Sequence, residues 1–164
     1  MIEKTYPITE KVLASTLSAV QKLFELLNKE SENLVLKTDP VALSTIVAHK
    51  REVVTQLELF SDQLGQLLET EKLAADHAGI DQYLNIAQTA GINIGDSRIC
   101  WSSITALSKK CRILNEQNGA SIDLLSRHTQ RAIQILKGKS QMANTYGPDG
   151  SARSEIFSHT LISV

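Results

Sequence analysis

Histidine, cysteine and carboxylate side chains are the residues of this chain that could do chemistry, as metal ligands, nucleophiles or general acids and bases. The four histidines lack the spacing of metal ligands, both to one another and to the two cysteines. They are His49, His77, His128 and His159. No pattern holds two carboxylates together in an apolar cleft, where general acid–base catalysis would need them. We therefore expect no metal, no cofactor and no enzymatic activity.

Two further chemical signals are weak. Cys100 and Cys111 both fall on the apolar face of a predicted helix, about 16 Å apart, which is too far for a disulfide within the chain and favours packing. Gly138-Lys139-Ser140 resembles the end of a phosphate-binding loop. The full motif needs a glycine five residues before the Gly-Lys pair, and that position is Ile133, inside a predicted helix. Neither signal supports catalysis or nucleotide binding.

Composition excludes other classes. The 164 residues carry a formal net charge of −1, with 42% hydrophobic and only 4% aromatic side chains, so the chain has neither the basic field nor the stacking residues of a nucleic-acid module. No apolar run approaches the roughly 20 residues of a membrane span. Residues 1–11 hold no apolar signal core. We expect a cytoplasmic protein with no nucleic acid partner and no membrane insertion.

Apolar residues at alternating steps of three and four predict long helices with coiled-coil-like seams. In the first helix they are Leu13, Leu17, Val20, Phe24, Leu27 and Leu34, with Ser31 in the one missing position. In the second they are Leu43, Ile46, Val53, Leu57, Phe60, Leu64 and Leu67, and Lys50 interrupts them, with an ammonium expected to reach outward. In the third they are Cys100, Ile104, Leu107, Cys111 and Leu114.

The signals at helix ends complete the predicted architecture. Thr9 follows Pro7 as an N-cap of the first helix, Asp39-Pro40 starts the second, and Asp96 caps the third. The short connection at Pro40 makes the first two helices antiparallel. The predicted fold is therefore all-α, an elongated antiparallel bundle or coiled coil of three long helices, a short connecting helix and a flexible C-terminal tail. The expected ranges are long helices at about 9–37, 40–76 and 97–137, a short helix at about 80–90, one domain over 1–138 and a mobile tail over 139–164.

Charge is unevenly divided between the second and third long helices. Asp39 to Asp76 contain seven acids and three bases, and Ser97 to Gly138 contain seven bases and two acids. Opposite net charges favour placing these two helices side by side.

The segment from Leu114 to Ile122 contains Asn118-Gly119, and it has two interpretations. Asn-Gly can end a helix. Alternatively the helix continues, Gly119 lets another backbone approach, and the later apolar face stays free for a partner helix. That face consists of Ile122, Leu125, Ile133 and Leu136.

Two blocks resemble a known family. Asn115-x-x-Asn118-Gly119 followed by Ile122 and Arg131-Ala132-Ile133, and then Tyr146-Gly147-Pro148-Asp149-Gly150, resemble the FlgN family of flagellar export chaperones. The helical part of the resemblance covers most of the chain. It implies a cytoplasmic type III secretion chaperone that binds hook-associated flagellar proteins, prevents their premature assembly and delivers them to the export gate.

The resemblance also implies which residues act. Client binding would fall on the last long helix, at Asn118, Gly119, Ile122, Leu125, Ile133 and Leu136. Tyr146 would contact the cytoplasmic domain of the export gate. The apolar ending, with Ile156, Phe157 and Leu161, matches no family motif. The alternative is a structural coiled-coil protein that self-associates into a homo-oligomer through the same heptads.

Overall fold

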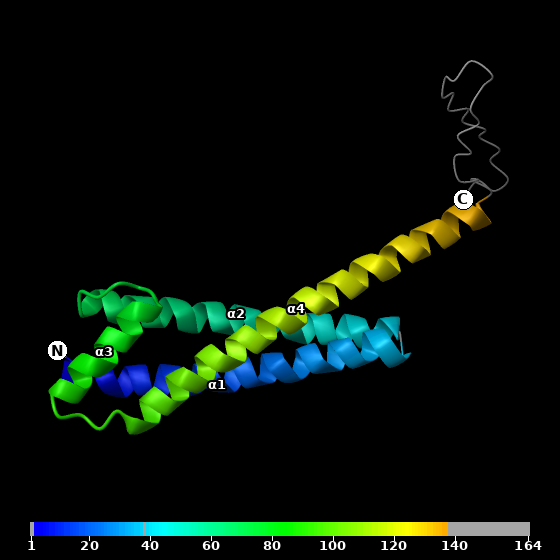
Figure 1. The fold of residues 1–164 in the computed structure, drawn as a ribbon. Helices are drawn as coiled ribbons and strands as arrows, with labels where there is room; N and C mark the ends of the chain where they lie inside the picture. The colour runs from blue at the N-terminus through cyan, green and yellow to red at the C-terminus, as the bar shows by residue number, and fades with distance from the viewer. Residues whose placement is uncertain (1, 38, 138–164) are drawn as a thin grey trace, which may run out of the picture. The chain divides into compact units, whose positions relative to one another are not determined.

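The computed structural model describes residues 2–37 and 39–137, and Figure 1 shows their arrangement. These residues form four α-helices and no strand, so the predicted all-α helical bundle is confirmed. The elements are α1 (Ile2–Glu32), a π-helical turn η1 (Asn33–Lys37), α2 (Pro40–Thr70), α3 (His77–Thr89) and α4 (Gly95–Leu136). The predicted tail over 139–164 lies outside the described residues.

The chain divides into two compact units, Met1–Asn118 and Gly119–Val164. The first contains α1, α2, α3 and the first part of α4. The second contains the rest of α4, described as far as Lys137. The single domain predicted from the sequence covers residues 1–138, which takes in the first unit and the described part of the second.

Within the first unit, α1 and α2 lie side by side and run in opposite directions (Figure 1). The N-cap of α2 is Asp39, whose side chain accepts from the backbone N–H of Val41 and Ala42 at 3.0 and 3.3 Å, and Pro40 opens the helix as predicted. The start of α2 is therefore determined by two adjacent residues.

The first part of α4 follows α1 in the same direction. The Sγ of Cys100 lies 3.4 Å from the carbonyl oxygen of Leu13, and the Sγ of Cys111 lies 3.8 Å from that of Val20. Both cysteines are on the seam of α4, and both pack into the core, as the heptads predicted. Successive seam residues of α4 thus meet successive seam residues of α1.

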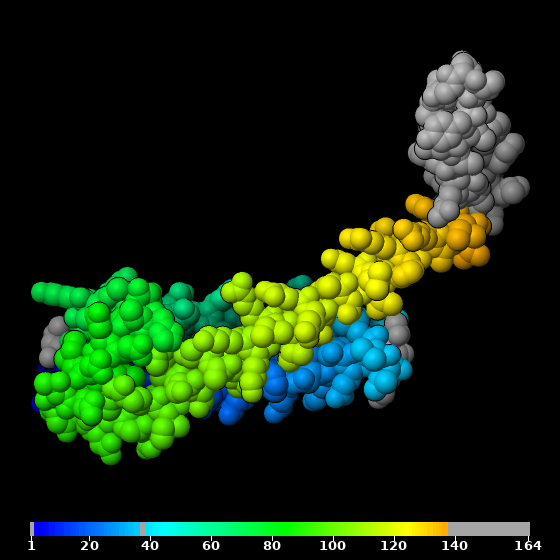
Figure 2. Space-filling model, in the orientation of Figure 1, coloured from blue at the N-terminus to red at the C-terminus, as the bar shows by residue number. Residues whose placement is uncertain are grey.

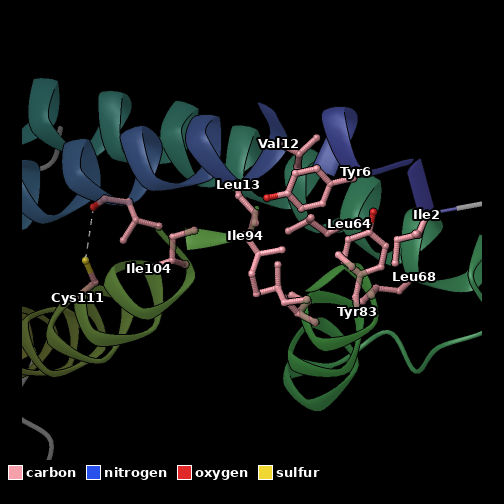
Figure 3. Close-up of a cluster of buried hydrophobic side chains, with 14 of the residues drawn as sticks. Ile2, Tyr6, Val12, Leu13, Leu64, Leu68, Tyr83, Ile94, Ile104 and Cys111 are labelled. Carbon is pink, nitrogen blue, oxygen red and sulfur yellow. Dashed lines mark hydrogen bonds between the residues drawn. The ribbon is translucent and has the colours of Figure 1, made fainter. Parts of the chain in front are cut away.

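The core collects apolar side chains from all four helices. Figure 3 shows Ile2 and Tyr6 of α1 close to Leu64 and Leu68 of α2 and to Tyr83 of α3. Farther along lie the predicted seam residues: Leu13, Val20, Leu27, Ile104 and Cys111 are buried, and Leu17, Phe24, Leu57, Phe60, Leu67, Cys100, Leu107 and Leu114 pack against them. The heptads therefore identified most of the core.

The predicted start of the first helix is wrong. Helix α1 begins at Ile2, and Pro7 lies inside it. Thr9 is not an N-cap, because its hydroxyl donates to the carbonyl of Thr5 and to the Tyr83 hydroxyl, both at 3.1 Å. The buried side chains of Ile2 and Tyr6 anchor these two extra turns. Tertiary packing therefore outweighs the cost of a proline near the helix start.

The second helix ends earlier than expected, at Thr70 and not at 76. Lys72 adopts a positive φ of 59°, its N–H donates to the Glu69 carbonyl at 2.9 Å, and the N–H of Leu73 donates to the Leu68 carbonyl at 2.9 Å. These two bonds form a Schellman motif. Glycine usually occupies the position of Lys72, so the sequence carries no signal for this end.

The short connecting helix exists but starts earlier than predicted. Asp76 caps α3, accepting from the backbone N–H of Gly79 at 2.8 Å. At the other end Gly91 has a φ of 82°, and Ile92 donates to the Ala87 carbonyl at 3.0 Å. This is the glycine form of the same motif. Helix α3 places the buried Tyr83 hydroxyl 2.9 Å from that of Thr5.

Helix α4 is continuous from Gly95 to Leu136 and passes through Gly119. Of the two interpretations of Asn118-Gly119, the helix end is therefore wrong. Asp96 lies in the first turn of α4 and is not its N-cap, since the helix already begins at Gly95.

Candidate functional site

A buried ion pair lies where α1, α2 and the middle of α4 meet. Glu30 of α1 has a fully buried side chain, and Lys50 of α2 donates from Nζ to its two carboxylate oxygens at 2.8 and 3.0 Å. Because the pair is buried, water screens the attraction between its two charges only weakly. If either side chain were removed, the other charge would remain buried without compensation. The pair ties the two arms of the hairpin together.

Asn118 joins α4 to this pair. Its Nδ2 donates at 2.9 Å to the Leu27 carbonyl and at 2.9 Å to Oε2 of Glu30, and its side chain is 3% exposed. One turn earlier, the Oδ1 of Asn115 accepts from Lys50 Nζ at 3.4 Å. The two asparagines of the Asn-x-x-Asn-Gly block thus contact the same ion pair from one side of α4. We call Glu30, Lys50, Asn115 and Asn118 the ion-pair cluster.

The outward orientation predicted for Lys50 is wrong. Its ammonium turns inward to Glu30, and 20% of its side chain is exposed. The seam around Lys50 is apolar, so a charge there needs a partner of opposite sign. Glu30 lies next to the weak seam position Ser31 and was not singled out by the heptads. A lysine inside an apolar seam was the available signal for a buried acid on a facing helix.

The apolar seam of α4 continues beyond Asn118 without a change of phase. At about 100° per residue, Ile122, Leu125, Ile133 and Leu136 fall on the same side of the helix as Ile104 and Cys111. Exposure changes along this line: Ile104 and Cys111 are each 5% exposed, and Leu136 is 86% exposed.

The predicted client-binding residues therefore differ in accessibility. Ile122 and Leu125 are half-buried, Ile133 is 44% exposed and Leu136 is almost fully exposed. We call these four residues the α4 stripe. Asn118 is buried within the chain. Tyr146, the predicted contact for the export gate, lies outside the described residues.

Two exposed apolar residues of the same segment were missed by the sequence pattern. Leu124 is 57% exposed and Ile135 is 70% exposed. They lie 11 residues apart, three helical turns, and about a third of a turn around the helix from the middle of the stripe. The heptad rule follows one line of residues and so ignores them.

Gly119 has open space around it. A Cβ atom on this residue would have no described atom within 4 Å, apart from its two chain neighbours and the backbone of its own helix nearby. The described chain therefore gives no packing reason for glycine here, although glycine costs about 1 kcal/mol relative to alanine within a helix. Close approach by a second molecule remains the prediction for this residue.

Within the described part of the chain, the two thiols and the possible metal ligands show no reactive arrangement. Burial raises the pKa of the Cys100 and Cys111 thiols, so both thiols stay protonated near neutral pH. Among residues 2–37 and 39–137, no three His, Cys, Asp or Glu side chains group as metal ligands would. In the same residues, no helix combines the length and apolar character needed to cross a bilayer.

Comparison with known proteins agrees with the asparagine motif. No curated protein and no solved structure matches the chain. A family model described as FlgN protein matches residues 6–154, which is most of the chain. The match takes in α2, α3, α4, the ion-pair cluster and the α4 stripe. The chain belongs to the FlgN family, a family of flagellar export chaperones and not of enzymes.

Proposed function

We propose that this chain binds hook-associated flagellar proteins before export, prevents their premature assembly and delivers them to the export gate. Family membership supports the general role. The observation that carries the client-binding step is the α4 stripe, which continues a seam that is buried at Ile104 and Cys111 and becomes exposed at Ile133 and Leu136. A partner helix with apolar anchors at matching spacing would cover it.

The physical reason for such a chaperone lies in its clients. A terminal helix that has not yet assembled exposes an apolar face and tends to aggregate. The stripe covers that face, and the entropy lost on ordering the client keeps the complex releasable. Binding and release then need neither a nucleotide nor a metal.

Within this proposal Asn118 and Gly119 have different roles. Asn118 has a structural role, because its two hydrogen bonds hold α4 against α1 at the last buried turn before the stripe. Gly119 follows directly and leaves space that a client backbone fills. Asn118-Gly119 therefore lies at the boundary between the part of α4 that packs on α1 and the part that contacts the client.

The stripe is tested by changing Leu125→Asp together with Ile133→Asp. Carboxylates on the stripe would have to be buried against apolar client side chains, so affinity for the terminal region of a hook-associated protein should fall about a hundredfold or more. Titration calorimetry measures the affinity, and circular dichroism checks that helicity is kept.

The matched control is Leu124→Asp with Ile135→Asp, which makes the same chemical change on the other exposed line of the same helix. It should bind the client almost as well as the unchanged chain. Undiminished client binding by the Leu125→Asp, Ile133→Asp variant would refute the stripe as the binding surface. Equal losses in both variants would mean that the segment binds without a preferred face.

Delivery is proposed to depend on Tyr146. The Tyr146→Ala variant should keep its client but lose affinity for the cytoplasmic domain of the export gate, because the aromatic ring is the largest apolar group of the Tyr-Gly-Pro-Asp-Gly block. Calorimetry with the isolated gate domain measures this. Equal gate affinity with and without the ring would contradict the assignment.

A further inference from the structure

A groove runs between α2 and α4 in the first unit. It consists of two adjoining hollows, of about 650 and 290 Å³, which share Leu57. The larger is lined by α2, Thr16 of α1, the start of α3 and Trp101 of α4, and the smaller by α1, α2 and α4. In Figure 2 the teal atoms of α2 lie set back behind α3 and α4. We call the two hollows together the α2–α4 groove.

The floor of the groove has the spacing of a helix-packing surface. Thr16, Val20, Leu23 and Leu27 of α1 line it at steps of four, three and four residues. On one wall, Val54 of α2 is 39% exposed. Three helices that leave an apolar furrow of this spacing offer the place that the fourth helix of a four-helix bundle would take.

Charge distinguishes the two ends of the groove. Asp62 and Glu69, one heptad apart on α2, line the larger hollow with no ion-pair partner among the described residues. At the smaller hollow, the basic Lys50 and Arg112 are already paired with Glu30 and Glu116. Three of the four floor residues are therefore apolar, and among the described residues the groove carries unpaired charge only at its acidic end.

Trp101 lines the larger hollow. Its indole Nε1 is buried without a hydrogen-bond partner among the described residues, and its ring lies 4.8 Å from that of His77. A buried N–H without an acceptor costs about 1–3 kcal/mol. Trp101 is also the one tryptophan of the chain, so its fluorescence reports on this groove.

We propose that the α2–α4 groove accepts an amphipathic helix of a partner protein, which packs as a fourth helix and places lysine or arginine beside Asp62 and Glu69. The partner helix would set its apolar face on Leu23 of the floor and on Val54, both of which are still partly exposed. Its basic residues would fix its direction along the groove, because only one end is acidic. The α2–α4 groove lies in the first unit and shares no residue with the α4 stripe. One binding surface can therefore be refuted while the other stands.

The test uses the full chain and two synthetic amphipathic helices of about 18 residues with leucines at heptad spacing. One carries lysines toward one end, and the other carries glutamates there. Titration is followed by Trp101 emission at low salt. The lysine helix should bind saturably and shift the emission, and the glutamate helix should bind about tenfold more weakly or not at all.

The charge contact is tested by Asp62→Lys with Glu69→Lys, which should weaken the lysine helix about tenfold. Glu52→Lys with Glu58→Lys is the matched control: it makes the same charge change at exposed positions of α2 that do not line the groove. Equal binding of both peptides, or equal loss in both variants, would overturn the proposal. Self-association of the chain with the same Trp101 shift would overturn it too, because the occupant would then be a second copy.

Discussion

Lys50→Met is expected to lower the free energy of unfolding by about 3 kcal/mol, although it replaces a lysine by an apolar residue of similar length in an apolar seam. The reason lies in Glu30, whose carboxylate is fully buried and would lose the one cation that pairs with it among the described residues. The amide of Asn118 alone cannot balance a buried charge. Urea denaturation followed by circular dichroism measures the loss.

The control for this prediction removes both charges. The double change Glu30→Met, Lys50→Met should return stability to near that of the unchanged chain, because no unpaired charge remains and Asn118 keeps its bond to the Leu27 carbonyl. Arg112→Met breaks an exposed ion pair with Glu116 and should change little. A Lys50→Met variant as stable as Arg112→Met would show that the buried pair does not hold the hairpin together.

Gly79→Ala should destabilise the chain by about 2–3 kcal/mol, against the usual preference for alanine in helices. A Cβ on Gly79 would clash with the backbone carbonyl of Ala74, and a carbonyl of the chain cannot turn aside as a flexible side chain can. Relief would require α3 to shift, and α3 carries the fully buried Tyr83 and Leu84. Thermal and urea unfolding measure the effect.

Gly65→Ala is the matched control. A Cβ on Gly65 would lie 3.8 Å from the Cβ of Ala75, which is an ordinary van der Waals contact. This glycine lies inside α2, so alanine should stabilise the chain by about 0.5–1 kcal/mol. If both alanine variants changed stability in the same direction, the close approach of Ala74 to α3 would not be what requires Gly79.

The interiors of the helices could be predicted from the sequence because burial there follows one periodic line. Leu13, Val20 and Leu27 lie on that line and are among the most buried residues of α1. The ends could not be predicted as well, because they depend on contacts between distant segments. Thr9 has the side chain of an N-cap, yet its hydroxyl donates a hydrogen bond to the hydroxyl of Tyr83, 74 residues away.

The candidate site was predictable to the extent that it extends the seam. The stripe follows from spacing alone, whereas the exposure of Ile133 and Leu136 is known only from the structure. The ion-pair cluster was not predictable in this way, because Glu30 lies off the seam and its partners are 20 and 88 residues away. The role of Asn118 likewise depends on which carbonyl and carboxylate α1 presents to it.

We propose that residues 119–137 of α4 form the surface that binds the client. Hydrogen exchange of the full chain, with and without the terminal region of a hook-associated protein, measures this directly. Backbone amides of residues 119–137 should exchange at least about tenfold more slowly when the client is bound, and those of 100–111 should not change. Unchanged exchange over 119–137 in a complex that has formed would contradict the claim.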